Sequence, residues 1–171
     1  MTKNILIFRT DRVGDLIVSC PTILTIKETF KNPNITLVAS TKNYDYAKNL
    51  SFFDNILIFP SSNILAKIKF IFKLRKKTFD YIYIFDGKEK SFISAFLIKS
   101  SIKVGISTKI KKYQKFLNIK IFLFANHKLY DVFQKTLDYT KINKQISFYN
   151  FISKKKNNNF FNKIPLNIFF Q

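Results

Sequence analysis

Short apolar runs recur along the chain and are separated by longer segments of mixed character. Four of them are nearly continuous in β-branched or aromatic residues, at 5–8, 35–39, 56–59 and 81–85. A fifth candidate strand covers 103–106, and a weaker sixth covers 119–124. Continuous apolar runs are typical of strands that are buried on both faces, as in a parallel sheet. The pattern therefore predicts a mainly parallel sheet.

The segments between these runs have helical spacing. Residues 16–30 are rich in apolar side chains, and Pro21 is expected to kink this helix or to start a second one. Asn63 is placed to cap the next helix. That helix is predicted to point its lysines outward and to bury an apolar stripe, formed by Ile64, Ile68, Ile71 and Phe72. Further helical patterns cover 91–98 and 129–139.

The alternation of strand and helix patterns predicts an α/β, Rossmann-like, doubly wound fold with right-handed crossovers. The chain of 171 residues is long enough for one domain with a proper core. We expect that domain to cover residues 1–145. Beyond it the pattern degrades into a polar tract at 154–159 and an apolar tail. Residues 146–171 are therefore expected to be a linker and the start of a further, C-terminal domain.

The segment that follows the first predicted strand concentrates polar chemistry. Arg9, Thr10, Asp11 and Arg12 form a loop, and Gly14 and Asp15 open the next helix. In doubly wound folds ligands bind outside the carboxyl ends of the strands, where this loop lies. The two arginines have the chemistry to hold phosphates or carboxylates of an acidic ligand, and solvated loop arginines are the alternative. Asp11 is predicted to be a turn residue rather than a second base.

Glycine placement adds to this picture, because the chain has only three glycines. Gly14 is predicted to permit a close backbone approach or a positive φ. There is no GxGxxG pattern, so a dinucleotide fingerprint is not supported. Asp86 and Gly87 end the fourth predicted strand on the same side of the sheet. They are predicted to line the ligand cleft, with a plain strand-exit turn as the alternative.

The formal net charge of +20 invites a nucleic-acid interpretation. However, 27 of the 30 basic residues are lysine, and only Arg9, Arg12 and Arg75 are arginine. Base readout and bidentate phosphate recognition favour arginine, so nucleic acid is not the expected partner. Most lysines are interpreted as a solvated surface, although a basic surface also favours anionic partners such as acidic lipid headgroups.

The small number of cysteine and histidine residues limits the metal and redox chemistry that the chain could support. Cys20 is the only cysteine and His127 the only histidine, which excludes an internal disulfide and clusters of Cys or His ligands. We therefore expect no metal site. No apolar run reaches the ~18–20 residues that cross a bilayer, and no signal peptide is recognised. A cytoplasmic protein is expected.

The motif ILIFRTDRVGDLIVSCPTILTIKETF, at 5–30, resembles the start of glycosyltransferase family 9, the bacterial heptosyltransferases of lipopolysaccharide assembly. Similar correspondences cover 34–38, 53–56, 79–87 and 103–106. His127 precedes the helical pattern at 129–139, as a family histidine does. The resemblance spans about residues 3–140 and is strongest at the first motif.

This resemblance implies one half of a GT-B glycosyltransferase, which has two Rossmann-like domains. The N-terminal domain binds the saccharide or glycolipid acceptor, and the C-terminal domain binds a nucleotide-sugar donor, the only cosubstrate implied. Asp15 is then the general base, whereas capping of a helix N-terminus is its structural alternative. The residues expected to bind the acceptor are Arg9, Thr10, Arg12, Gly14, Asp86, Gly87 and His127. The family's role implies a cytoplasmic enzyme, peripheral at the inner membrane.

Other functions stay open at this stage. The chain is either a working transferase whose donor-binding domain is supplied separately, or a non-catalytic remnant that binds an acceptor. A basic nucleic-acid-binding domain is the third and least favoured class, because no recognition motif accompanies the lysines.

Overall fold

The computed structural model describes residues 2–61, 63–108, 112–123 and 129–142. Its centre is one six-stranded sheet in the order β3-β2-β1-β4-β5-β6, and every strand pairing is parallel. The strands are β1 (Asn4–Phe8), β2 (Asn34–Ala39), β3 (Asn55–Ile58), β4 (Phe79–Ile84), β5 (Ser100–Ser107) and β6 (Ile119–Phe122). The predicted α/β, Rossmann-like parallel fold is confirmed.

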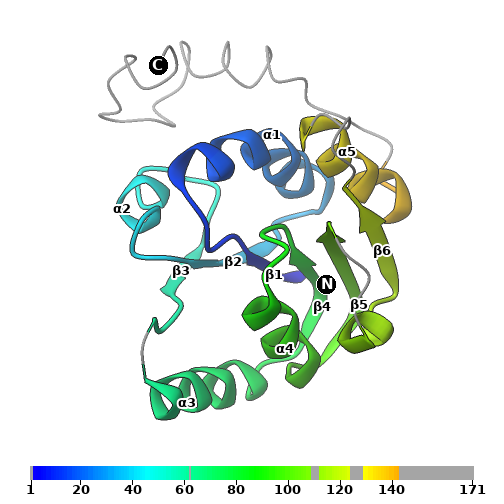
Figure 1. The fold of residues 1–171 in the computed structure, drawn as a ribbon. Helices are drawn as coiled ribbons and strands as arrows, with labels where there is room; N and C mark the ends of the chain where they lie inside the picture. Colours follow the sequence, from blue (N-terminus) through cyan, green and yellow to red (C-terminus); the bar gives the residue numbers. More distant parts are fainter. Residues whose placement is uncertain (1, 62, 109–111, 124–128, 143–171) are drawn as a thin grey trace.

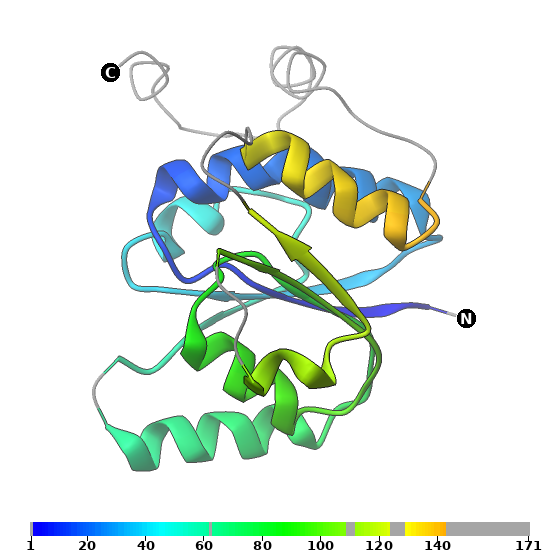
Figure 2. The same cartoon turned by 45° about the vertical axis from the view of Figure 1, so that its right-hand side comes forward.

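Helices cover both faces of this sheet (Figures 1 and 2). One face carries α1 (Val13–Thr29), α2 (Tyr44–Ala47) and α5 (Leu129–Tyr139). The other carries α3 (Ile64–Arg75), α4 (Glu89–Leu97) and the 3₁₀ helix η1 (Lys112–Phe116). The predicted domain boundary near residue 145 and the segment 146–171 lie outside the described residues.

The strands alternate between two cores. In β1, Ile5 and Ile7 pack into the core beneath α1 and α5, whereas Leu6 and Phe8 pack into the core beneath α4. All four side chains are completely buried. Because both faces of the sheet are covered by helices, successive positions of β1 from Ile5 to Phe8 are all apolar, which explains a continuous apolar run in the sequence.

Helix α1 contains Pro21 in its interior. It is one continuous helix from Val13 to Thr29, so no second segment starts at the proline, and the expected kink stays a prediction. Proline removes one main-chain donor, so an interior proline normally breaks or bends a helix. Here the segment from Leu16 to Ile26 is buried almost throughout, and α1 contacts α5 along its side. Packing of these side chains holds the helix together across the proline.

Helix α3 departs from the expected orientation. Asn63 caps it as predicted, because its Oδ1 accepts a hydrogen bond from the N–H of Leu65 at 2.8 Å. The stripe expected in the core is instead turned outward: Ile64 is 70% exposed and Phe72 is 58% exposed. Leu74 is the only residue of the helix that is fully buried. The periodicity therefore identified the helix correctly. It did not identify the buried side, because apolar residues occur on more than one side of this helix.

Among the residues that the structure describes, no helix is long and apolar enough to cross a membrane.

Candidate functional site at the ends of β1 and β4

The strand order places a switch point between β1 and β4. From β1 the chain proceeds outward to β2 and β3, and then returns to β4 on the other side of β1. The loops that leave β1 and β4 therefore diverge at the carboxyl edge of the sheet, and ligands bind in such a crevice in open α/β folds. Arg9 and Thr10 leave β1 there, and Phe85 and Asp86 leave β4.

Arg9 is the buried anchor of this edge. Its side chain is only 2% exposed. Its Nε and Nη2 donate to the main-chain carbonyl of Asp15, with the Nε bond at 2.9 Å, and its Nη1 donates to the carbonyl of Phe85. The guanidinium also lies 4.9 Å from the centre of the Phe133 ring in α5. Arg9 thus joins β1, α1, the exit of β4 and α5.

Asp11 forms an ion pair with Arg9. One carboxylate oxygen, Oδ2, lies 3.0 Å from Arg9 Nη1, and the other, Oδ1, is buried without a hydrogen-bond partner in the structure. The pKa of Asp11 is raised to about 6, mainly by burial; Arg9 opposes this shift, and the carboxylates of Asp15 and Asp86 contribute to it. Asp11 is therefore more than the turn residue that the sequence predicts, because it is a half-buried carboxyl beside a buried cation.

Asp86 ties the two loops together. Its Oδ2 accepts hydrogen bonds from the N–H and hydroxyl of Thr10, at 3.2 and 2.7 Å, and from the hydroxyl of Ser91 at 2.6 Å. Its Oδ1 accepts from the N–H of Lys88 at 3.1 Å. Lys88 also joins the two loops, because its Nζ donates a hydrogen bond to the carbonyl of Thr10 at 2.7 Å. Asp86 and Thr10 are therefore brought together as the sequence predicts, but as partners of each other.

Asp15 lies in the first turn of α1, with its carboxylate at the mouth of the site. Its side chain is 37% exposed, and Oδ1 lies 3.8 Å from Arg9 Nη2. Oδ2 accepts a hydrogen bond from the N–H of Arg12 at 3.2 Å, so the carboxylate also caps the helix. A partly exposed carboxylate with one weak cap contact retains lone pairs for a substrate hydroxyl.

Gly87 and Gly14 differ in whether their surroundings would tolerate a side chain. Gly87 has a φ of +61°, and a Cβ there would lie 3.2 Å from the carbonyl oxygen of Ile106, so this turn needs glycine. Gly14 has no positive φ, and a Cβ there would meet nothing within 4 Å. The expected positive φ at Gly14 is therefore wrong, whereas the alternative, a close approach of a ligand to this backbone, stays a prediction. Its open surroundings leave room for a ligand above the start of α1.

A pocket of about 220 Å³ lies between these loops. Six of its lining residues come from the segments described above: Arg9, Asp11, Asp15, Phe85, Asp86 and Gly87. Ser107 and Thr108, at the end of β5, also line it and were not anticipated from the sequence. They follow a predicted strand at the same sheet edge, which is the signal that could have found them.

The remaining predicted site residues lie elsewhere. Arg12 and Gly14 are exposed outside the pocket lining, and Thr10 is buried beneath it. His127 lies outside the described residues, so its contact with an acceptor stays a prediction. Among the described residues, no group of three or more His, Cys, Asp or Glu side chains is arranged to hold a metal ion.

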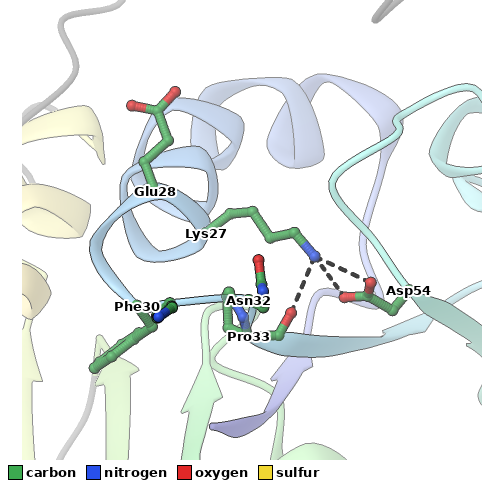
Figure 3. A pocket seen from close by; sticks show the side chains of 7 residues that line it. Lys27, Glu28, Phe30, Asn32, Pro33 and Asp54 are labelled. Carbon is green, nitrogen blue, oxygen red and sulfur yellow. Dashed lines mark hydrogen bonds and ion pairs between the residues drawn. The ribbon is translucent and has the colours of Figure 1, made fainter. Parts of the chain in front are cut away.

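A second hollow of about 440 Å³ lies beside the loop that joins α1 to β2 (Figure 3). Lys27 crosses it and donates to the carboxylate of Asp54 at 2.7 Å and to the carbonyl of Pro33 at 3.0 Å. Asp54 in turn accepts a hydrogen bond from the N–H of Ile35 at 2.7 Å. These contacts fix the loop to the start of β2, so this hollow has a structural explanation.

Comparison with known proteins relates the fold to one group of enzymes. No protein-family model and no curated protein sequence matches the chain. Solved structures do match. A glycosyl transferase family 9 protein from Veillonella parvula has a TM-score of 0.70 at 16% identity, over 83% of this chain and 42% of that protein.

Two E. coli structures match in the same way. The heptosyltransferase WaaC, solved with ADP-2-deoxy-2-fluoro heptose, has a TM-score of 0.63 at 17% identity, over 85% of this chain and 51% of WaaC. The ADP-heptose lps heptosyltransferase II has a TM-score of 0.59 at 18% identity, over 72% of this chain and 35% of that protein. The chain spans about half the length of these proteins or less. The resemblance to glycosyltransferase family 9 is thus confirmed at the level of the α/β fold.

Proposed function

We propose that this chain is the acceptor-binding part of a glycosyltransferase of the heptosyltransferase type. The enzyme would transfer a sugar from a nucleotide-sugar donor to a lipopolysaccharide or other cell-envelope saccharide acceptor bound by this chain. The fold likeness supports the general class. The observation that carries the proposal is the position of Asp15, whose partly exposed carboxylate lines a pocket at the switch point of the sheet.

In the proposed reaction Asp15 acts as the general base. Its carboxylate takes the proton of an acceptor hydroxyl while that oxygen forms a bond to the anomeric carbon of the donor sugar. The bond from that carbon to the nucleoside diphosphate breaks, and the diphosphate leaves with the bonding electrons. A base within ~2.6–3.2 Å of the hydroxyl suffices for this role. Arg9 positions Asp15 through its main-chain carbonyl and adds positive charge beneath the pocket.

The acceptor contacts follow from the pocket lining and its rim. Arg12 is exposed beside Asp15 and has the geometry of guanidinium groups that hold acidic substituents. Ser107 and Thr108 also line the pocket, and the Ser107 hydroxyl accepts a hydrogen bond from Gln114 Nε2 at 2.8 Å. We assign both residues to contacts with the saccharide. The family resemblance implies a donor site in a C-terminal domain, so we assign the nucleotide sugar to a separate domain or partner.

Acceptor binding and transfer are tested separately. Binding of lipopolysaccharide-type saccharides to the chain is measured by calorimetry for the wild type, Asp15→Asn and the control Asp45→Asn, whose carboxylate is 86% exposed in α2. Transfer is measured with a panel of nucleotide sugars, after adding a donor-binding partner. We expect Asp15→Asn to bind the acceptor and to lose transfer, whereas Asp45→Asn keeps both. Full transfer by Asp15→Asn would overturn the role of Asp15.

A non-catalytic acceptor-binding module is the second candidate. It is favoured by the hydrogen bond between the Asp15 carboxylate and the N–H of Arg12, which gives this residue a purely structural use. In that case every variant binds acceptor, and no donor or partner produces transfer. Loss of helix stability in Asp15→Asn without any transfer by the wild type supports this reading.

A further inference from the structure

Helix α3 presents an apolar face to the surroundings of the molecule. Ile64, Leu65 and Phe72 are 70%, 66% and 58% exposed, and Ile68 is 43% exposed. We call these four side chains the α3 face. Large apolar side chains scattered singly over a surface are ordinary, but four on three turns of one helix form a patch. The proposed transferase site does not use them.

The position of these residues around the helix axis explains why they remain uncovered. Leu74 is buried, and Phe70 packs toward the sheet with its ring 5.4 Å from that of Phe59. At ~100° per residue the α3 face occupies an arc of about 100°, on the side of the helix opposite Leu74 and Phe70. Figures 1 and 2 both show α3 at the outer edge of the molecule, on the side of the sheet that faces away from α1 and α5.

The charge around the α3 face has one sign. Of the 10 acidic residues in the chain, none lies between residues 55 and 79. The same stretch holds six cations: Lys67, Lys69, Lys73, Arg75, Lys76 and Lys77. By helical spacing Lys69 lies about 40° and Lys73 about 80° beyond one edge of the face. Arg75 lies at its C-terminal end with its guanidinium 5.9 Å from the Phe72 ring. The result is an apolar arc with a purely cationic border.

We propose that α3 lies on the surface of an anionic lipid bilayer, with the α3 face inserted among the acyl chains and its lysines on the acidic headgroups. A helix of 12 residues is too short to span a bilayer, so it lies in the plane of the interface. Exposed apolar side chains supply insertion, and each nearby Lys or Arg adds attraction to anionic lipid.

The same charges argue against a second copy of the chain as the occupant. A symmetric dimer would bring this face against its own copy, since a two-fold interface uses the same surface on both subunits. The six cations would then face six cations with no acidic residue of α3 to compensate. The negative charge of acidic headgroups is complementary to these cations, whereas the positive charge of a second α3 would repel them.

Helix α4 extends the surface on the same side of the sheet. It contacts α3, and its Ile93 and Phe96 are 45% and 59% exposed. The Phe96 ring contacts the ring of Phe116 in η1 in a tilted arrangement, with 5.3 Å between the ring centres. The bilayer-facing surface therefore continues from α3 toward α4. This inference does not depend on the proposed transferase function, because lipid binding is measured without donor or acceptor.

Vesicle flotation of the full 171-residue chain tests the proposal. Vesicles of phosphatidylcholine alone are compared with vesicles that also contain phosphatidylglycerol. We expect binding only when phosphatidylglycerol is present, and release at high salt, because salt screens exposed charges. Neutralising two bordering lysines in Lys69→Gln/Lys73→Gln should weaken partitioning about thirtyfold. Ile64→Ser/Phe72→Ser should weaken it more than about tenfold through lost apolar insertion.

Matched controls separate a specific face from the overall charge. Lys31→Gln/Lys120→Gln removes the same charge from exposed positions outside α3, and Tyr139→Ser removes a 63% exposed aromatic ring from α5 on the opposite face. Both should bind like the wild type, and circular dichroism confirms that every variant folds. Equal weakening by the controls overturns the proposal. So does a dimer in sedimentation velocity that Ile64→Ser/Phe72→Ser dissociates, since the α3 face would then serve self-association.

Discussion

The guanidinium of Arg9 binds the main-chain carbonyl of Asp15 and leaves the Asp15 carboxylate 3.8 Å away. The arginine therefore fixes the position of the first turn of α1 without occupying the oxygens that chemistry at this edge requires. It also satisfies the carbonyl of Phe85 and the carboxylate of Asp11. One buried side chain thus sets the relative placement of the loops that form the pocket.

Removal of Arg9 should strongly destabilise the fold. Arg9→Met retains much of the side-chain volume, but it leaves two main-chain carbonyls and the Asp11 carboxylate without their partner. Removing one member of a buried charge pair costs about 3–5 kcal/mol. Urea denaturation followed by circular dichroism measures this loss. The control is Arg12→Met, which is exposed and should change the free energy of unfolding by less than about 0.5 kcal/mol.

The comparison of the two arginines also has a functional outcome. If Arg12 contacts an acidic acceptor, Arg12→Met folds normally and binds the acceptor more weakly. Equal stability of Arg9→Met and Arg12→Met would contradict the assignment of Arg9 as the anchor of this edge.

The hydroxyl of Thr10 contributes to the link between β1 and β4. Thr10→Val keeps the branched shape and removes the 2.7 Å hydrogen bond to Asp86. Because Thr10 is buried and the acceptor is a carboxylate, we expect a loss of about 1–3 kcal/mol in the free energy of unfolding. Thr10→Ser keeps the hydroxyl and should lose less than Thr10→Val. A reversed order of the two variants would show that the methyl group, not the hydrogen bond, matters at this position.

The sequence was sufficient to predict the fold, because its signals are local. Continuous apolar runs indicate strands covered on both sides, and helical segments between them imply parallel crossovers. The edge of the sheet that holds the site also followed, since Arg9 and Asp86 both come directly after strands. What could not be predicted was which partner each polar group takes. Arg9 and Thr10 bind other parts of the protein, which the sequence did not indicate, and their expected contact with an acceptor stays a prediction.

The continuity of α1 across Pro21 and the rotation of α3 have a shared physical origin. Whether a proline interrupts a helix depends on how firmly the surrounding side chains are packed, which the local sequence does not contain. Whether the stripe that includes Ile64 and Phe72 faces inward depends on how the neighbouring elements cover the sheet. Periodicity identifies both helices, and tertiary packing decides their continuity and rotation.

Glycine positions 87 and 14 should respond in opposite ways to alanine. Gly87→Ala places a side chain at a φ of +61° and 3.2 Å from the carbonyl oxygen of Ile106, so a loss of about 1–3 kcal/mol is expected. Gly14→Ala meets open space inside a helix and should be neutral or stabilising by up to ~1 kcal/mol. Thermal unfolding distinguishes them. Weaker acceptor binding by the well-folded Gly14→Ala would locate the ligand above the start of α1.

Gly105, in the middle of β5, is required by packing rather than by conformation. A Cβ at this position would lie 2.6 Å from Phe92 Cε1 and 2.7 Å from Leu117 Cδ1. Both side chains are buried, so neither can move away freely, and Gly105→Ala should lose about 1–3 kcal/mol. Denaturant unfolding measures this. The double variant Gly105→Ala/Phe92→Leu should recover part of the loss, and a double variant that is additive would contradict the clash.

Asp11 should make stability depend on pH in an unusual direction. Burial raises its pKa to about 6 in the folded protein, with Asp15 and Asp86 adding to the shift, from an ordinary value of 3.8. The folded state therefore holds this proton more tightly than the unfolded chain does. Below about pH 4 both states are protonated, and the stabilisation linked to the proton is complete. It is lost as pH rises through about 6, because the unfolded state ionises first.

The difference between the wild type and Asp11→Asn isolates this effect, since the asparagine does not titrate. We expect the free energy of unfolding of the wild type, relative to the variant, to fall by about 1–2 kcal/mol between pH 4 and pH 7, after discounting for partial exposure of the carboxylate. Urea unfolding at a series of pH values measures it. Asp45→Asn, at an 86% exposed position, should show no such fall. A difference that rises with pH would mean that the ion pair with Arg9 outweighs burial, and that Asp11 is ionised throughout this range.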